Sequence, residues 1–88
     1  MKMIIAIIRD NDNDPVSQAL VAAGFRVTRI ASTGGFLRRG SSTLMIGVEN
    51  EQVEQAIQII RESTTPAEDP NTRRVTLFVI NVEHFTQI

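Results

Sequence analysis

Apolar and polar residues follow one another along this chain in a pattern that predicts four strands and two helices. The opening segment, Met1–Ile8, is apolar at both odd and even positions after Lys2, which is typical of a strand buried on both faces. Three later runs also predict strands, namely Phe25–Ser32, Thr43–Val48 and Arg73–Asn81. The last of these is again apolar on both faces.

Two amphipathic segments between these strands predict helices. Asp14 is expected to cap the first helix, with Pro15 at its first helical position and Gly24 as its C-terminal cap. Asn50 is expected to cap the second helix. Apolar residues at helical spacing mark the inward faces: Val16, Ala19, Leu20 and Ala23 in the first helix, and Val53, Ala56, Ile57 and Ile60 in the second.

Four local features depart from plain alternation. In the second strand the apolar phase slips, which predicts a bulge or a strong twist near Arg29. In the third strand Gly47 stands in the interior, where it favours the close approach of a backbone or ligand. A polar, proline-containing connector covers Ser63–Asn71, and the tail Val82–Ile88 is expected to form a short final strand.

The order β-α-β-β-α-β predicts a single α+β domain over residues 1–88, a ferredoxin-like sandwich with both helices on one face of an antiparallel sheet. Two helices cover only one face, yet the first and last strands are apolar on both. Monomers rarely leave such a patch exposed. We therefore expect a homo-oligomer whose sheets pack against one another around a symmetry axis.

Composition narrows the possible functions. A net charge of −1 argues against a protein that coats nucleic acid or a membrane surface. The absence of cysteine excludes disulfides, thiolate zinc sites and thiol nucleophiles. No apolar run approaches the ~20 residues of a membrane span, and the chain begins directly as a strand. The expectation is a soluble, cytoplasmic domain.

The loop Thr33–Ser42 carries the chemistry that does not belong to a plain core. Its glycines and backbone N–H groups can form an anion nest, and Phe36-Leu37 adds an apolar surface. Four arginines surround it (Arg26, Arg29, Arg38 and Arg39), and no acidic residue occurs from Pro15 to Val48. These features suit a nucleotide-sized anion. An ordinary hairpin or a subunit contact remains the competing interpretation, and no Walker or GxGxxG spacing is present.

The sequence gives little support for a catalytic or metal-binding site. The single histidine, His84, has no second imidazole or matched base, so a role in packing the tail is the better interpretation. Asp10, Asp12 and Asp14 alternate like the start of a calcium loop, but Pro15 occupies the position of the turn glycine. We expect no enzyme activity, no metal and no cofactor.

Several blocks of the chain, taken together, resemble the PII-like cyclic-di-AMP receptor proteins. They are M-K-M-I-I-A-I-I, F-R-V-T-R-I-A-S-T-G-G-F-L-R-R-G-S-S-T, L-M-I-G-V and T-L-F-V-I-N-V-E-H-F-T-Q-I, and T-G-G-F-L-R-x-G is the most specific of these. The resemblance covers nearly the whole chain. It implies a ferredoxin-like homotrimer that binds one cyclic dinucleotide in each cleft between subunits and has no catalytic activity.

The resemblance also implies which residues contact the ligand. In it, Arg26 lies near a phosphate, Gln87 faces an adenine edge, and the loop contributes backbone N–H groups and apolar contact. The full set is Arg26, Thr28, Gly35, Phe36, Leu37, Ser41, Gly47, Phe78 and Gln87. These roles agree with the chemistry of the residue types.

Two departures from the family pattern bear on function. Ser41 stands where the family commonly has asparagine, and a hydroxyl makes a less selective contact with a base edge than an amide does. The connector Ser63–Asn71 is shorter than expected, which weakens the expectation of a downstream protein partner. Two alternatives follow, a trimer that senses ATP or ADP and a trimer with a purely structural or protein-interaction role.

Overall fold

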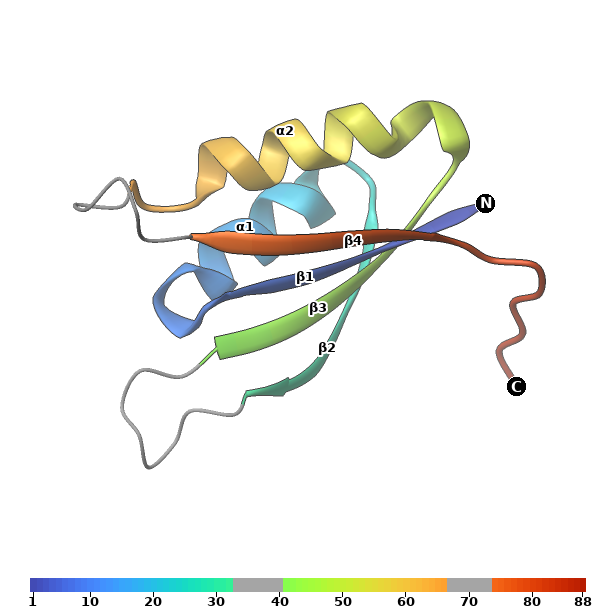
Figure 1. Cartoon of the computed structure of the whole chain (residues 1–88), viewed down its shortest axis with the longest axis horizontal. Coiled ribbons are helices and arrows are strands. Elements are labelled where there is room, and N and C mark those ends of the chain that lie inside the picture. The colour runs from blue at the N-terminus through green and yellow to red at the C-terminus, as the bar shows by residue number, and fades with distance from the viewer. Residues whose placement is uncertain (33–40, 67–73) are drawn as a thin grey trace.

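The fold was analysed in a computed structural model that describes residues 1–32, 41–66 and 74–88 (Figure 1). The helices and strands in these ranges follow one another in the predicted β-α-β-β-α-β order. They are β1 (Lys2–Arg9), α1 (Asp10–Ala22), β2 (Arg26–Ser32), β3 (Ser41–Val48), the 3₁₀ turn η2 (Asn50–Gln52), α2 (Val53–Ser63) and β4 (Val75–Asn81). The predicted strands and helices are thereby confirmed, with small differences at their ends.

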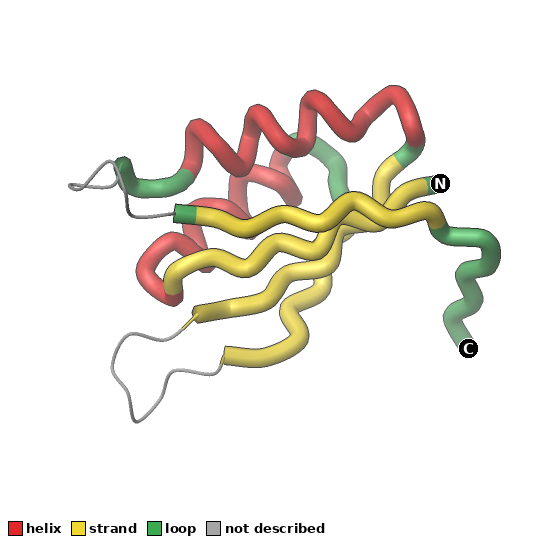
Figure 2. The backbone as a smooth tube through the Cα atoms, viewed as in Figure 1, coloured by secondary structure: helices red, strands yellow, loops and turns green. Residues whose placement is uncertain are grey.

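The four strands form one antiparallel sheet in the order β2-β3-β1-β4. Both helices lie against the same face of this sheet, and the other face carries no element of the described chain (Figure 2). The expected ferredoxin-like arrangement is therefore correct. We call the uncovered side the open face; it carries Met3, Ile5 and Ile7 of β1 and their register partners on the neighbouring strands.

The core lies between the helices and the covered face of the sheet. Every second residue of β1 and β3 contributes to it, because only one face of each strand is covered within the chain. For β1 this differs from the prediction of a strand buried on both faces. Its buried apolar members are Ile4, Ala6, Ile8, Val16, Leu20, Phe25, Leu44, Ile46, Val48, Ala56 and Ile60. The predicted inward faces of both helices are thus confirmed, except that Ala23 lies beyond the end of α1 and is exposed.

The predicted start of α1 was wrong, and its predicted end was right. The helix begins at Asp10 rather than at Asp14, so Pro15 lies inside it and Asp14 caps nothing. Acidic side chains in the first turn favour the earlier start because they stabilise the free N–H groups there. At the other end Gly24 has φ of 93°, and the Phe25 N–H donates to the Leu20 carbonyl at 3.0 Å. This is a Schellman cap, which requires a left-handed residue.

The remaining local predictions have mixed outcomes. Glu49, not Asn50, precedes the second helical segment, where its backbone N–H donates to the Gln52 side chain at 3.0 Å in a capping box. The bulge predicted near Arg29 is confirmed by a shift of register between Arg29 and Ala31. The tail does not form the expected strand; after β4 only one backbone hydrogen bond outside helices and strands is found in the described chain, from the Val82 N–H to the Met1 carbonyl.

Asp12 ties the first turn of α1 to the chain that leaves α2. Its carboxylate is 1% exposed, lies 2.9 Å from an Arg9 guanidinium nitrogen, and accepts hydrogen bonds from the Thr65 backbone N–H at 3.1 Å and hydroxyl at 2.8 Å. Burial alone would raise the pKa of Asp12, but the hydrogen bonds from Thr65 and Arg9 outweigh it and lower the pKa. Beside it, the buried Ser42 hydroxyl donates to Asp10 at 2.6 Å.

Candidate functional site

A pocket of about 400 Å³ lies at the end of the sheet where the N-terminus, the turn after α1 and the tail come together. In Figure 1 this is the end marked by N and C. The volume falls within the roughly 300–1,000 Å³ of small-molecule sites. The pocket is lined by Met1, Lys2, Met3, Gly24, Phe25, Arg26, Thr28, Met45, Gly47, Gln52, Val82 and Phe85.

Strand register places the central residues of this pocket. Gly47 pairs with Met3 of β1 on one side and with Arg26 of β2 on the other. Paired residues of an antiparallel sheet point to the same face. Arg26 and Met3 therefore stand on either side of a position that has no side chain. A Cβ atom built on Gly47 would meet a single neighbour outside its adjacent residues, the Met1 Cε at 3.9 Å, so the space above Gly47 is open.

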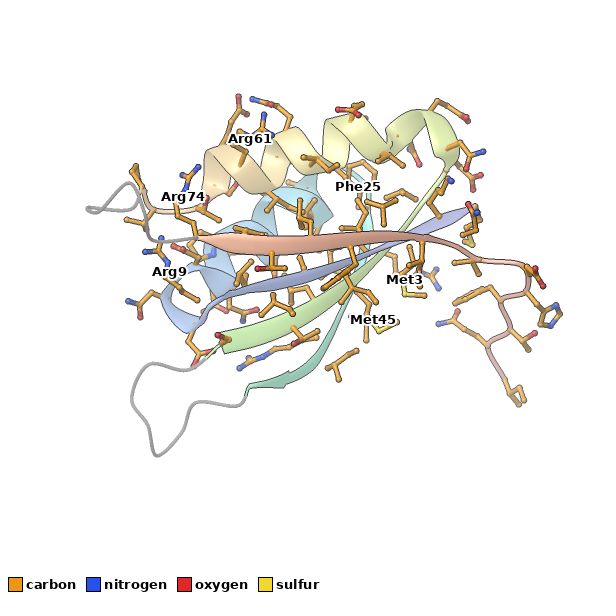
Figure 3. All side chains as sticks on the ribbon, in the orientation of Figure 1. Met3, Arg9, Phe25, Met45, Arg61 and Arg74 are labelled. Carbon is orange, nitrogen blue, oxygen red and sulfur yellow. The ribbon has the colours of Figure 1, made fainter. Side chains whose placement is uncertain are left out.

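In the next row of the sheet Thr28 and Met45 line the pocket, and Ile5 and Phe78 extend the open face beyond it. Thr28 pairs with Met45, Met45 pairs with Ile5, and Ile5 pairs with Phe78 of the edge strand β4. Met3 and Met45 extend from neighbouring strands close to one another, whereas Phe25 lies between the sheet and the helices (Figure 3). The floor of the pocket is thus apolar, with polarisable methionine sulfur atoms available to a ring system.

The C-terminal tail closes one side of the pocket. The Arg26 side chain donates a hydrogen bond from Nη1 to the Gln87 Oε1 at 2.6 Å, across a sequence separation of 61 residues. Phe85 lies in the chain between this contact and the end of β4, and it lines the pocket while remaining 54% exposed. The tail is therefore held at both ends, by the Val82 backbone and by the Gln87 side chain.

The charge of the pocket is one-sided. Arg26 and Lys2 are basic, and none of the twelve lining residues is acidic. Arg26 is exposed and its described partner is a neutral amide, so its guanidinium is available for an anion. An apolar floor beside a basic group suits a ligand that combines a flat ring with a phosphate.

The residues expected to contact a ligand fall into three groups. Arg26, Thr28 and Gly47 line the pocket, and Gln87 is bonded to Arg26. Phe78 lies on the same open face but two strands away from Met45, and it is not among the lining residues. Ser41 begins β3, at the end of that strand opposite Gly47. The loop contacts Gly35, Phe36 and Leu37 lie outside the described residues.

Several lining residues were not anticipated from the sequence. Met3 and Met45 could have been found from the register, because residues that pair with or flank Gly47 on one face must share its pocket. Phe25 and Lys2 were expected only as residues at the start of a strand. Phe85 carried no such signal, because the tail has no periodicity that would place it over the sheet.

A second, smaller hollow of about 270 Å³ lies on the helix side of the sheet, between α2 and β4. Arg61 and Arg74 are at its edges, near Arg9 (Figure 3). None of the residues expected to contact a ligand lines it. The pocket around Gly47 is therefore the candidate site.

The described ranges 1–32, 41–66 and 74–88 offer neither a metal centre nor a membrane-spanning helix. No group of three or more histidine, cysteine or carboxylate side chains there is arranged to hold a metal ion. No helix in those ranges is long and apolar enough to cross a membrane.

The fold and sequence match known proteins along most of their length. One solved structure, described as that of a functionally unknown protein from Pediococcus pentosaceus ATCC 25745, superposes with a TM-score of 0.77 at 30% sequence identity. The match covers 99% of this chain and 96% of that one. A family model described as cyclic-di-AMP receptor matches residues 1–73. The resemblance noted from the sequence is thus confirmed, and the chain belongs to the PII-like cyclic-di-AMP receptor family.

Proposed function

We propose that this protein is a cytoplasmic, non-catalytic receptor that binds cyclic-di-AMP in clefts between the subunits of a homotrimer. The family that the chain belongs to is described as cyclic-di-AMP receptor, and this supports binding of cyclic-di-AMP. The observation that carries the proposal is the pocket in which Arg26 stands beside the open position at Gly47. A phosphate placed there would receive charge-assisted hydrogen bonds from the guanidinium.

The base of such a ligand also finds suitable surroundings. Met3 and Met45 offer an apolar floor, and Thr28 offers a hydroxyl that both donates and accepts. With no side chain at Gly47, a ring can approach the backbone of β3. These features support a purine nucleotide, and the family supports cyclic-di-AMP among the purine nucleotides.

The open face of the sheet supports the homotrimer. Ile7 is 37% exposed, Phe78 51% and Ile80 44%, and all three belong to this one face. Burying apolar surface contributes roughly 25 cal/mol per Å², so packing these faces together around a three-fold axis would stabilise the assembly. The same packing would leave the pocket, which opens on that face, beside a neighbouring subunit.

The spacing of the expected contacts also favours a shared site. Arg26 and Gly47 lie at one end of β2 and β3, whereas Ser32 and Ser41, from which the intervening loop departs, lie at the other. The length of β3 separates the two ends by about 20 Å. A ligand that contacts both Arg26 and the loop is therefore more readily bound when these two contacts come from different subunits.

Titration calorimetry with cyclic-di-AMP, cyclic-di-GMP, ATP and ADP tests the function. We expect saturable binding of cyclic-di-AMP that is weakened at least tenfold, about 1.4 kcal/mol, in Arg26→Ala. Preferential binding of ATP would support the alternative nucleotide sensor, which Ser41 makes reasonable. No heat with any of the four at high micromolar ligand would leave the structural trimer as the better interpretation.

Subunit mixing tests the location of the ligand. Arg26→Ala and Phe36→Ala variants are each expected to bind poorly, because each lacks one side of the cleft. After denaturation and joint refolding at equal amounts, about a quarter of the clefts in a cyclic trimer combine two intact sides. Recovery of that fraction by calorimetry supports a shared site, while no recovery from the mixture places all contacts in one chain.

We also propose that ligand binding orders the loop of residues 33–40 and so creates a surface for another protein. This part of the proposal rests on the sequence of the loop, which lies outside the described residues. Hydrogen exchange over residues 33–42 provides the test. Slower exchange with cyclic-di-AMP supports a switch, and equal exchange with and without ligand contradicts it.

A further inference from the structure

We infer that Phe85 is the stacking cover of the nucleotide pocket and that the Arg26–Gln87 hydrogen bond holds this cover in place before ligand arrives. The inference rests on the proposed function, because it names how a base is gripped in the same pocket. It assigns a role to Phe85, which lies beyond the family match over residues 1–73 and was not among the residues expected to contact a ligand.

The tail has the geometry of a cover fixed at two points. Its first anchor is the Val82 N–H, which donates to the Met1 carbonyl at 3.1 Å. Its second anchor is the Gln87 carboxamide, which accepts from Arg26 at 2.6 Å. Phe85 lies between the anchors and is the aromatic residue that the tail contributes to the pocket. The other aromatic lining residue, Phe25, is buried in the core.

The exposure of the ring indicates an unfilled contact. Phe85 lines the pocket and still leaves 54% of its surface exposed, so about half of this residue remains available for contact with a ligand. Opposite the tail, Met3 and Met45 form an apolar floor, and Gly47 leaves room above β3. A purine between floor and ring would cover the exposed surface, and stacking on an aromatic side chain tolerates any base.

The second anchor gives the cover a way to respond to the ligand. Arg26 now donates to a neutral amide oxygen, and a phosphate would accept a stronger, charge-assisted bond from the same guanidinium. An arriving phosphate therefore competes with Gln87 for Arg26. The carboxamide that is released can then donate and accept at a base edge close to Phe85. Ligand binding thus replaces the contact between Gln87 and Arg26 by two contacts of the tail with the base, one from Gln87 and one from Phe85.

Calorimetry on tail variants separates this inference from the proposed function. We expect Phe85→Ala to bind cyclic-di-AMP roughly tenfold or more weakly, and Phe85→Leu to lie between it and the original protein, because leucine keeps apolar contact without a stacking face. Ile88→Ala is the matched control, since Ile88 is an apolar residue of the same tail that is fully exposed and outside the pocket. Thermal unfolding of all variants should stay unchanged, because these side chains lie outside the core.

Fluorescence gives a second readout. The chain contains no tryptophan and no tyrosine, so Phe85→Trp introduces a single indole reporter. Stacking predicts quenching that saturates with the same midpoint as the calorimetric heat. If cyclic-di-AMP binds but Phe85→Ala keeps full affinity, or the indole emission does not change, the cover is refuted while the receptor stands. If the original protein binds no nucleotide, both the receptor and its cover are overturned.

Discussion

Substitution of Gly47 should raise stability and lower nucleotide affinity at the same time. Gly47 lies in the interior of β3, and the described glycine with positive φ is Gly24, not Gly47. A Cβ atom at position 47 meets only the Met1 Cε, at 3.9 Å, which is ordinary van der Waals contact. The fold therefore does not need glycine at this position, and only the pocket uses the space.

The magnitude follows from this geometry. Glycine within a strand is about 0.5–1 kcal/mol less favourable than alanine, so Gly47→Ala should stabilise the protein by that amount. In a domain of this size, 1 kcal/mol raises the Tm by roughly 4–8 °C. The added methyl group occupies the approach to the β3 backbone, and overpacking of a fitted contact costs about 1–3 kcal/mol. That corresponds to a loss of roughly 5- to 150-fold in affinity.

Thermal unfolding and calorimetry on the same samples measure the two effects. Gly47→Ala and the bulkier Gly47→Val are compared at one protomer concentration, since the Tm of an oligomer depends on it. Gly24→Ala serves as the contrast, because φ of 93° strains an alanine there by about 1–2 kcal/mol. Its Tm should fall where that of Gly47→Ala rises.

Two results would refute this reasoning. Full affinity for cyclic-di-AMP in Gly47→Val would show that the ligand does not approach β3 at this position, and the candidate site would be misplaced. A marked fall in the Tm of Gly47→Ala would show that the backbone or a packed neighbour requires glycine, contrary to the open space found above it.

Three further predictions concern other parts of the molecule. The pKa of Asp12 in the folded protein lies below the ordinary 3.8. Its contribution to the free energy of unfolding should therefore be complete above about pH 5 and be lost as pH falls through the folded pKa. Asp12→Asn should lower the free energy of unfolding by about 1–3 kcal/mol at pH 7, and urea titrations at several pH values should show a weaker dependence on acid than in the original protein. Gln87→Glu turns the contact with Arg26 into an ion pair and repels a phosphate, so calorimetry should show weaker binding of cyclic-di-AMP, and unchanged affinity would contradict the competition for this arginine. Ile80→Asp on the open face should convert trimers to monomers in light scattering, whereas Val21→Asp, at a more exposed position on α1, should not. An intact Ile80→Asp trimer places the interface elsewhere.

Alternation predicted the covered face of β3, whereas β1 is apolar at both odd and even positions after Lys2 and its buried half could not be predicted in this way. The start of the first helix was also missed. Residues such as Ile4, Leu44 and Ile46 are buried because a strand with one covered face buries every second side chain. The start of α1 depends instead on Asp12, whose partner Thr65 is 53 residues away in the sequence. No local pattern reveals such a tertiary contact, and Asp14-Pro15 was the stronger local signal.

Single residues of the candidate site could be predicted from the sequence, but their arrangement in space could not. Gly47 was marked by its unusual position and Arg26 by its charge, but their pairing depends on the register of β2 and β3. The contact of Gln87 with Arg26 was not implied by any spacing, because a tail without periodicity can cross the sheet anywhere. Phe85 lay in the same segment and was missed for the same reason.

Ligand binding and assembly should be thermodynamically coupled, because one row of side chains serves both. Met45 lines the pocket, and its register partner Ile5 leads directly to Phe78 on the open face. A ligand in the cleft between subunits binds the trimer and not the monomer, so at a hundred times its Kd it stabilises each cleft by about 2.7 kcal/mol. In a dilution series followed by light scattering, cyclic-di-AMP should then move trimer dissociation to much lower protein concentration. If ligand instead raises the Tm but leaves the dilution curve in place, it binds monomer and trimer equally, and the pocket must be complete within one chain.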